Sequence, residues 1–146
     1  MIFWLSIALE SRPNAAPGFF LFRFSIRNPS INSPVPAALA QAGQALRGKG
    51  KGGRNTELAL AAVSELADFP GVMLVTLATD GEDGSTDAAG AVVTGGTYRR
   101  AADLGLQPGD FLERNDSYTF FAALDDLLKP GPTGTNTNDL VFLFTF

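Results

Sequence analysis

The chain has 146 residues, of which 45% are hydrophobic and 18% charged, a balance typical of one globular domain with a hydrophobic core. It contains no cysteine and no histidine, which excludes disulfides, thiolate or imidazole metal sites and histidine acid–base catalysis. Any chemistry must therefore use carboxylates, lysine, arginine, hydroxyls, backbone amides or a hard cation, which is the toolkit of phosphoryl transfer. The formal net charge of −4 disfavours a nucleic-acid partner.

The first 46 residues differ in composition from the rest. They hold two apolar runs, Met1–Leu9 and Gly18–Ile26, and prolines at positions 13, 17, 29, 34 and 36. Neither run reaches the roughly 18–20 residues that span a bilayer, and no basic segment precedes the first as in a secretory signal. We therefore expect no membrane partner and a cytoplasmic protein. The scarcity of acidic residues leaves an organelle-targeting segment open, beside one or two strands or a start altered by truncation or a frameshift.

After Gly48 the pattern predicts helices and strands in an orderly succession. Leu58, Ala62 and Leu66 lie about one turn apart and predict a helix over 56–66 that ends at Phe69-Pro70-Gly71. The further elements predicted are a strand at 72–78 buried on both faces, a polar glycine turn at 79–86, a small-residue run at 87–93, helices at 97–104 and 116–128, and a strand at 140–146. This alternation predicts an α/β fold, layered α/β/α with a mixed sheet and glycine-rich loops at strand and helix ends.

A basic glycine loop, Gly48–Asn55, directly precedes the first predicted helix. Its glycines allow backbone amides to face an anion, and the helix start adds its positive end. Lys49, Lys51 and Arg54 add full charges. The loop satisfies G-x-G-x-x-G, but no convincing strand precedes it and no Gly-Lys-Ser/Thr occurs, so we predict neither a Rossmann site nor a P-loop. A solvated basic loop without a ligand is the alternative.

An acidic turn, Thr79–Gly90, follows the strand predicted at 72–78. In α/β folds, ligands commonly bind in the loops beyond the carboxyl ends of strands. Asp80, Asp83 and Asp87 offer carboxylates suited to Mg²⁺, with substrate phosphates completing its coordination. The alternative is a turn whose side chains cap the next helix, a role that suits Asp87.

A third loop, Gly131–Asp139, places hydroxyls and amides around glycines, where they can contact phosphate or hydroxyl oxygens. An ordinary long connection before a strand is the alternative. Asn115-Asp116-Ser117 either joins this site or is a helix N-cap. Because all three loops lie beside predicted strand or helix ends, their convergence predicts a single site.

Four motifs in this order resemble a known family. They are the stretch 47–55 with Glu57–Ala61; Thr79-Asp80-Gly81 with Asp83-Gly84 and Thr86–Ala91; Asn115–Phe121; and Gly131–Asn136 with Asn138-Asp139-Leu140. Together they resemble the C-terminal domain of glycerate 2-kinases of the MOFRL type, also labelled hydroxypyruvate reductases. On this resemblance, residues 47–146 form a MOFRL-like domain, and residues 1–46 form an atypical segment that does not match.

The resemblance implies a two-domain enzyme that transfers phosphate from ATP to the 2-hydroxyl of D-glycerate with Mg²⁺, in a cleft between this domain and a larger Rossmann-like one. It implies that Arg54 grips a carboxylate or phosphate and that Asp80 is a base or metal-linked group. Of the carboxylates in the acidic turn, Asp80 and Asp83 are the predicted metal ligands. The resemblance also implies that Gly53, Asn55, Thr133, Thr135 and Asn136 line the cleft. Taken together with the loops described above, the residues predicted for substrate or nucleotide binding are Lys49, Lys51, Gly53, Asn55, Glu57, Gly81, Asp83, Thr86, Asp87, Asn115, Asp116, Thr133, Gly134, Thr135, Asn136, Asn138 and Asp139.

The sequence also departs from the family. Thr56 and Ser85 replace a usual Gln and Pro, which are mild changes. Residues 40–45 read Ala-Gln-Ala-Gly-Gln-Ala where the family has Ser-Gly-Gly-Glu-Thr-Thr, and the large domain with its lysine has no counterpart. We therefore expect part of a kinase, weakly active or inactive alone, whose other domain comes from elsewhere, for example another chain. A non-catalytic anion- or nucleotide-binding module and a hydroxypyruvate reductase are the alternatives; the sequence offers no supported nicotinamide site.

Overall fold

The computed structural model describes residues 5–10, 21–26 and 49–146, so the departures at 40–45 and the start of the basic loop at 47–48 lie outside it. The elements are β1 (Leu5–Glu10), β2 (Leu21–Ile26), α2 (Arg54–Glu65), β3 (Val72–Ala78), β4 (Gly90–Thr94), α3 (Thr97–Asp103), α4 (Pro108–Arg114), α5 (Ser117–Leu124), β5 (Leu127–Leu128) and β6 (Asp139–Thr145). The two N-terminal strands agree with the strand alternative for that segment.

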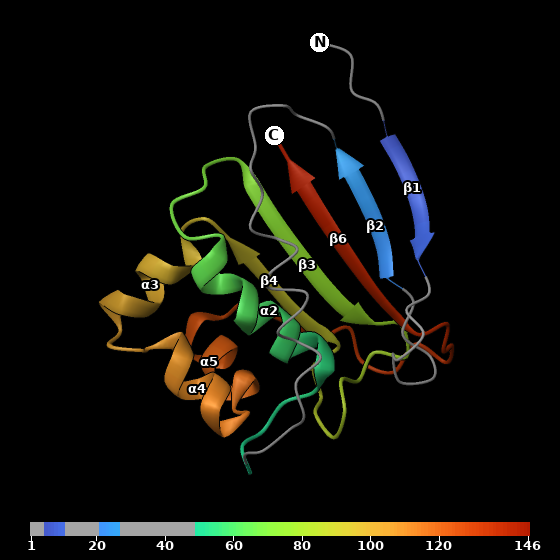
Figure 1. The fold of residues 1–146 in the computed structure, drawn as a ribbon. Helices are drawn as coiled ribbons and strands as arrows, with labels where there is room; N and C mark the ends of the chain where they lie inside the picture. The colour runs from blue at the N-terminus through green and yellow to red at the C-terminus, as the bar shows by residue number, and fades with distance from the viewer. Residues whose placement is uncertain (1–4, 11–20, 27–48) are drawn as a thin grey trace.

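The central sheet has four strands in the order β5-β4-β3-β6, and every neighbouring pair is antiparallel. β1 and β2 form a separate antiparallel pair, and β2 lies beside β6 (Figure 1). Figure 1 also shows α2 to α5 on the same face of the central sheet.

The predicted α/β class is confirmed, but two details of the prediction are wrong for the part of the chain that the structure describes. The central sheet is antiparallel rather than mixed, and one helical layer covers it rather than two. The reason is local: a turn over residues 79–89 joins β3 to β4 and reverses the chain, whereas a parallel neighbour needs a long crossover, usually a helix.

Burial along β3 alternates with the pleat of the strand. Leu74, Thr76 and Ala78 face the helices and are buried, while the residues between them are only half-buried. The expectation that both faces of β3 are fully covered is therefore met on the helix side alone. On the opposite face of the sheet, the rings of Phe142 and Phe144 in β6 stack with centroids 6.1 Å apart.

The core lies between α2 and the sheet. Leu60 and Val63 of α2 pack with Leu74 of β3 and with Phe120 and Phe121 of α5, all at most 2% exposed. The two phenylalanine rings meet edge to face at 5.2 Å. Each fully buried side chain of this size contributes about 2–3 kcal/mol, so this cluster holds α2, and with it the basic loop, in a fixed position.

Helix α4 and strand β5 were not predicted. Pro108 stands at the first position of α4, where its missing N–H costs nothing, but the short helix carries no long apolar repeat. The helix predicted over 116–128 ends early because Asp125 takes a left-handed conformation (φ 58°), and Leu127-Leu128 then pair with β4. Among the residues that the structure describes, no helix is long and apolar enough to cross a membrane.

Candidate functional site

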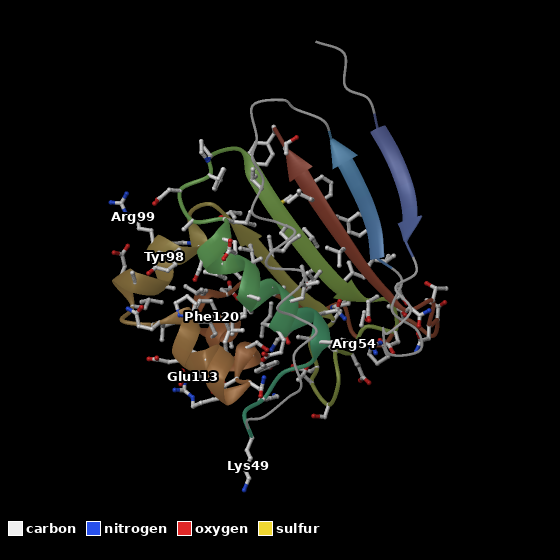
Figure 2. All side chains as sticks on the ribbon, viewed as in Figure 1. Lys49, Arg54, Tyr98, Arg99, Glu113 and Phe120 are labelled. Atoms are coloured by element: carbon white, nitrogen blue, oxygen red, sulfur yellow. The ribbon has the colours of Figure 1, made fainter. Side chains whose placement is uncertain are left out.

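A cavity of about 420 Å³ opens where the basic loop, the acidic turn and the third loop meet. Its lining residues are Gly52, Gly53, Arg54, Ala78, Asp80, Glu82, Asp83, Gly84, Asn136, Asn138 and Asp139. Figure 2 shows Arg54 at the start of α2 beside these loops, whereas Lys49 extends away from them. Parts of all three predicted loops therefore converge, and we call this cavity the Arg54 cleft.

Asp83 of the acidic turn caps helix α2. One carboxylate oxygen accepts hydrogen bonds from the backbone N and Oγ1 of Thr56 (2.8 and 2.9 Å), and the other from the backbone N and Nδ2 of Asn55 (3.1 and 3.2 Å). The residue at the N-cap position is Gly53, which has no side chain to do this, and a Cβ there would overlap the Asp83 carboxyl group. Asp83 is 1% exposed, so a buried carboxylate neutralises the positive end of the helix.

The backbone amides of the basic loop also bind protein groups. The amide of Gly50 donates to the carbonyl oxygen of Arg114 (2.9 Å), and the amide of Lys51 donates to Oδ1 of Asp116 (3.0 Å). With the amides of Asn55 and Thr56 bound to the capping carboxylate, these four N–H groups do not face a ligand. The loop is thus neither a free solvated segment nor, at these positions, the anion cradle that its glycines suggested.

The charged group that the basic loop does present is Arg54. Its side chain is 61% exposed, and its Nε contacts Oδ2 of Asp139 in an ion pair. The other oxygen of Asp139 accepts a hydrogen bond from Nδ2 of Asn55 (2.7 Å), which also reaches Asp83. Asp139 is 7% exposed, and its Oδ2 has no aligned hydrogen bond within residues 49–146. The arginine is therefore anchored to a buried carboxylate, which is fixed in turn by the start of α2.

Asp80, two residues beyond the end of β3, is half-buried in the cleft lining. Its Oδ1 accepts a hydrogen bond from the amide of Glu82 (3.3 Å), and its Oδ2 accepts one from Nδ2 of Asn136 (3.1 Å). Thr133 ties the same two loops together, since its amide donates to the Asp80 carbonyl (3.1 Å) and its hydroxyl to the Thr79 carbonyl (2.5 Å). Each Asp80 oxygen retains a lone pair that can serve a ligand.

Glu57 of α2 holds the connection between α4 and α5. Its carboxylate accepts hydrogen bonds from Nδ2 of Asn115 (3.2 Å) and from the backbone N of Ser117 (3.4 Å), and the side chain is buried. Asp116 stands at the N-cap position of α5, but its side chain makes no capping hydrogen bond to the backbone of the helix, so the capping alternative is met in position alone. Its carboxylate accepts a hydrogen bond from Oγ1 of Thr119 (2.7 Å). These residues do not line the cleft.

Asp87 belongs to an exposed cluster with Tyr118 of α5 and Lys129. It accepts a hydrogen bond from the hydroxyl of Tyr118 (2.6 Å) and pairs with Nζ of Lys129 (3.2 Å), which also donates to that hydroxyl (2.8 Å). The hydrogen bond from Tyr118, followed by that from Lys129, lowers the pKa of Asp87, and the contacts of Lys129 with Tyr118 and then with Asp87 raise the pKa of Lys129. Nζ of Lys51 lies 3.6 Å above the Tyr118 ring. The chain beyond Asp87 enters β4, so Asp87 is not the helix cap suggested for it.

Residues 42–139 match the family model described as the MOFRL family. The chain belongs to the MOFRL family. It is 47% identical over 109 residues to the D-glycerate 2-kinase of Thermotoga maritima, covering 73% of this chain and 26% of that protein. It is also 47% identical over 106 residues to the glycerate kinase of Homo sapiens, covering 68% and 20%. A putative hydroxypyruvate reductase of Agrobacterium vitis is 38% identical over 121 residues, covering 80% and 28%.

The fold agrees with these relatives. The crystal structure of glycerate kinase from Thermotoga maritima superposes with a TM-score of 0.68 at 46% identity, covering 69% of this chain and 24% of that chain. A crystal structure from Pyrococcus horikoshii gives a TM-score of 0.66 at 40% identity. The chain spans about a quarter of the length of these relatives. The resemblance read from the four motifs is confirmed.

The MOFRL domain brings together only part of the predicted binding set. Gly53, Arg54, Asp80, Asp83, Asn136, Asn138 and Asp139 line the cleft, whereas Lys49, Lys51, Asn55, Glu57, Gly81, Thr86, Asp87, Asn115, Asp116, Thr133, Gly134 and Thr135 do not. For this second set, binding roles stay predictions. Sequence reasoning missed Glu82 in the cleft lining and Tyr118 and Lys129 beside Asp87, because no local spacing marks such contacts.

The carboxylates of the MOFRL domain differ in their fitness for Mg²⁺. No group of three or more acidic residues within the described part of the chain is arranged to hold a metal ion. Mg²⁺ needs only one or two protein carboxylates when phosphate oxygens and water complete its shell. Asp80 fits this use, since it faces the cleft with lone pairs to spare. Asp83 as a metal ligand stays a prediction, because both its oxygens already accept two hydrogen bonds each.

Proposed function

We propose that this MOFRL domain forms one wall of a glycerate 2-kinase active site, where phosphate passes from ATP to the 2-hydroxyl of D-glycerate. The observation that carries the proposal is the exposed guanidinium of Arg54, held at Nε by Asp139 in a cleft that also contains Asp80. An arginine anchored in this way offers two terminal nitrogens to a carboxylate or phosphate, the bidentate geometry that suits such groups. The 47% identity to the D-glycerate 2-kinase of Thermotoga maritima supports the choice of substrate.

In this proposal, Arg54 binds the carboxylate of D-glycerate or the phosphoryl group in transit. Asp80 holds Mg²⁺ or accepts the proton of the attacking hydroxyl, and the amide of Asn136 orients it at 3.1 Å. Mg²⁺, when bound, neutralises charge on the phosphate oxygens. The domain also positions the reacting groups. The substrate and Asp80 must be held within hydrogen-bond distance of each other for phosphate transfer to be fast.

The charges of the Arg54 cleft indicate that this domain does not bind ATP unaided. Among the residues that the structure describes, the lining contains one cation, Arg54, against the carboxylates of Asp80, Glu82, Asp83 and Asp139. A triphosphate entering this surface meets net negative charge unless Mg²⁺ or another polypeptide supplies cations. We therefore propose that a Rossmann-like partner domain binds most of the nucleotide, and that the 146-residue chain alone transfers little or no phosphate.

The test is an assay of the purified chain with ATP, Mg²⁺ and D-glycerate, followed by detection of 2-phosphoglycerate. We expect no product above background from the chain alone, and product once the large domain of a relative is added in trans. Robust turnover by the chain alone contradicts the half-site. Calorimetry with D-glycerate separates a surviving substrate site from a non-binding remnant, and NADH oxidation with hydroxypyruvate tests the reductase alternative, for which we expect no signal.

A further inference from the structure

We propose that Asp139 is a positioning residue that turns the terminal nitrogens of Arg54 toward an anion in the cleft. This inference rests on the proposed function of the Arg54 cleft and assigns it a specific recognition device. The device recognises a planar, two-oxygen anion such as a carboxylate, and it works through the orientation of the guanidinium rather than through net positive charge.

Asp139 is fixed before any ligand arrives. It is the first residue of β6 and pairs with Ala78 of β3, so its backbone belongs to the sheet. One carboxylate oxygen accepts the Nδ2 hydrogen bond of Asn55 at 2.7 Å. Asn55 is itself held from two sides, since Nδ2 also donates to Asp83 (3.2 Å) and its carbonyl accepts the hydroxyl of Thr76 (2.8 Å). With 7% exposure, Asp139 has little freedom to turn away from the arginine.

The second oxygen of Asp139 serves Arg54. This buried Oδ2 has no aligned hydrogen bond within residues 49–146, and its ion-pair partner there is Nε of Arg54. Contact at Nε fixes the inner edge of the guanidinium plane and leaves both terminal nitrogens on its outer edge. The Arg54 side chain is 61% exposed at a cavity wall, so these nitrogens can reach a ligand without a change of backbone.

The Arg54–Asp139 ion pair has no net charge. A positioning role and a purely electrostatic role of Asp139 therefore predict opposite effects of its neutralisation on anion binding. If Asp139 only neutralised Arg54, Asp139→Asn would release a full positive charge and tighten anion binding. If Asp139 orients the two terminal nitrogens of Arg54, here called the fork, the same substitution places an amide beside Nε, frees the guanidinium to rotate, and weakens anion binding. Arg54→Lys gives a second contrast: it keeps the charge, but a lysine has one nitrogen, which Asp139 would occupy, so the fork is lost.

The experiment follows the Nε–Hε signal of Arg54 by NMR in the full chain, alone and during titration with D-glycerate and, separately, with inorganic phosphate. In the wild type we expect an Nε–Hε signal at one defined chemical shift that moves on addition of D-glycerate. In Asp139→Asn the chemical shift of the ligand-free signal should change, and affinity for D-glycerate should fall about tenfold or more, as it should in Arg54→Lys. Glu113→Gln, which makes the same charge change on the exposed face of α4, should leave both readouts unchanged.

Asp139→Glu provides a variant that keeps the buried charge. Its extra methylene displaces the fork, so affinity should fall although the net charge of the cleft is constant. Equal or tighter D-glycerate binding by Asp139→Asn overturns the positioning role while leaving the proposed function intact. A wild-type Nε–Hε signal that does not move on addition of D-glycerate counts against the proposed function of the cleft itself, and the positioning role falls with it.

Discussion

Replacing Asp83 by alanine is the most direct test of how the cleft is built. The carboxylate accepts four buried hydrogen bonds, two from the backbone amides of Asn55 and Thr56 and two from their side chains. The side-chain donors keep other acceptors, since Thr56 Oγ1 also reaches the Gly53 carbonyl (3.1 Å) and Asn55 Nδ2 reaches Asp139 (2.7 Å). The two backbone amides have no second acceptor among these contacts, so they account for most of the expected decrease in the free energy of unfolding.

Each buried amide left without an acceptor costs about 1–3 kcal/mol, and loss of a carboxylate from a helix start costs a further ~0.5–1 kcal/mol. We therefore expect Asp83→Ala to lower the free energy of unfolding by about 3–5 kcal/mol, a large part of the ~5–15 kcal/mol typical of a domain. Urea unfolding followed by circular dichroism measures this, with Glu113→Ala as a control that should change stability by less than about 0.5 kcal/mol.

The same variant should respond to anions. Removing the capping carboxylate uncovers the amides of Asn55 and Thr56 at a helix N-terminus, a ready site for phosphate. Inorganic phosphate should therefore stabilise Asp83→Ala more than the wild type or Glu113→Ala. A stability loss below about 1 kcal/mol, or no difference in the response to phosphate, would show that Asp83 does not cap the amides of Asn55 and Thr56 at the start of α2.

Three further outcomes follow from the packing and the charges. Gly53→Ala should cost about 1–3 kcal/mol in urea unfolding, because its Cβ would overlap the capping carboxyl group. Phe120→Ala, which empties a fully buried ring site, should cost about 3–5 kcal/mol by the same measurement; a cost below about 1 kcal/mol would contradict the packing described. Because the hydrogen bond from Tyr118 is the first cause of the lowered pKa of Asp87, Tyr118→Phe should raise that pKa in a carbon-13 NMR titration. The hydrogen bond between Tyr118 and Asp87 stabilises the fold at pH values above the unfolded-state pKa of Asp87, and this stabilisation is lost as pH falls through the lower folded-state pKa. Tyr118→Phe should therefore lose only this dependence of stability on pH in the acidic range.

Local patterns in the sequence predicted the elements with strong periodicity. The β-branched run predicted β3 at 72–78 with the bounds found, and the spacing of Leu58, Ala62 and Leu66 predicted α2, whose observed start lies two residues earlier than predicted. The end of α5 was missed because it depends on the left-handed conformation of Asp125, and an apolar Leu127-Leu128 pair fits a helix or a strand equally well.

The site was predictable as a meeting of loops but not as a set of contacts. Asp83 lies 27–28 residues from the amides that it caps, and Asn55 lies 84 residues from Asp139. Such partners are set by tertiary packing, which no spacing rule for helices or strands expresses. The residue at the N-cap position, Gly53, does not indicate in the sequence that the distant carboxylate of Asp83 caps the helix.

The identity of that cap changes how anion recognition in the cleft must work. A glycine-rich loop before a helix ordinarily binds phosphate through amides and the helix dipole, but here Asp83 takes the amides of Asn55 and Thr56. Under the proposed function, recognition is therefore left to the side chain of Arg54, whose charge Asp139 already balances. A cleft of this kind discriminates by the shape of the anion and not by attraction to charge in general. Such discrimination suits a small carboxylate such as D-glycerate better than a free triphosphate. A triphosphate at this acidic cleft wall needs cations that come from outside this domain.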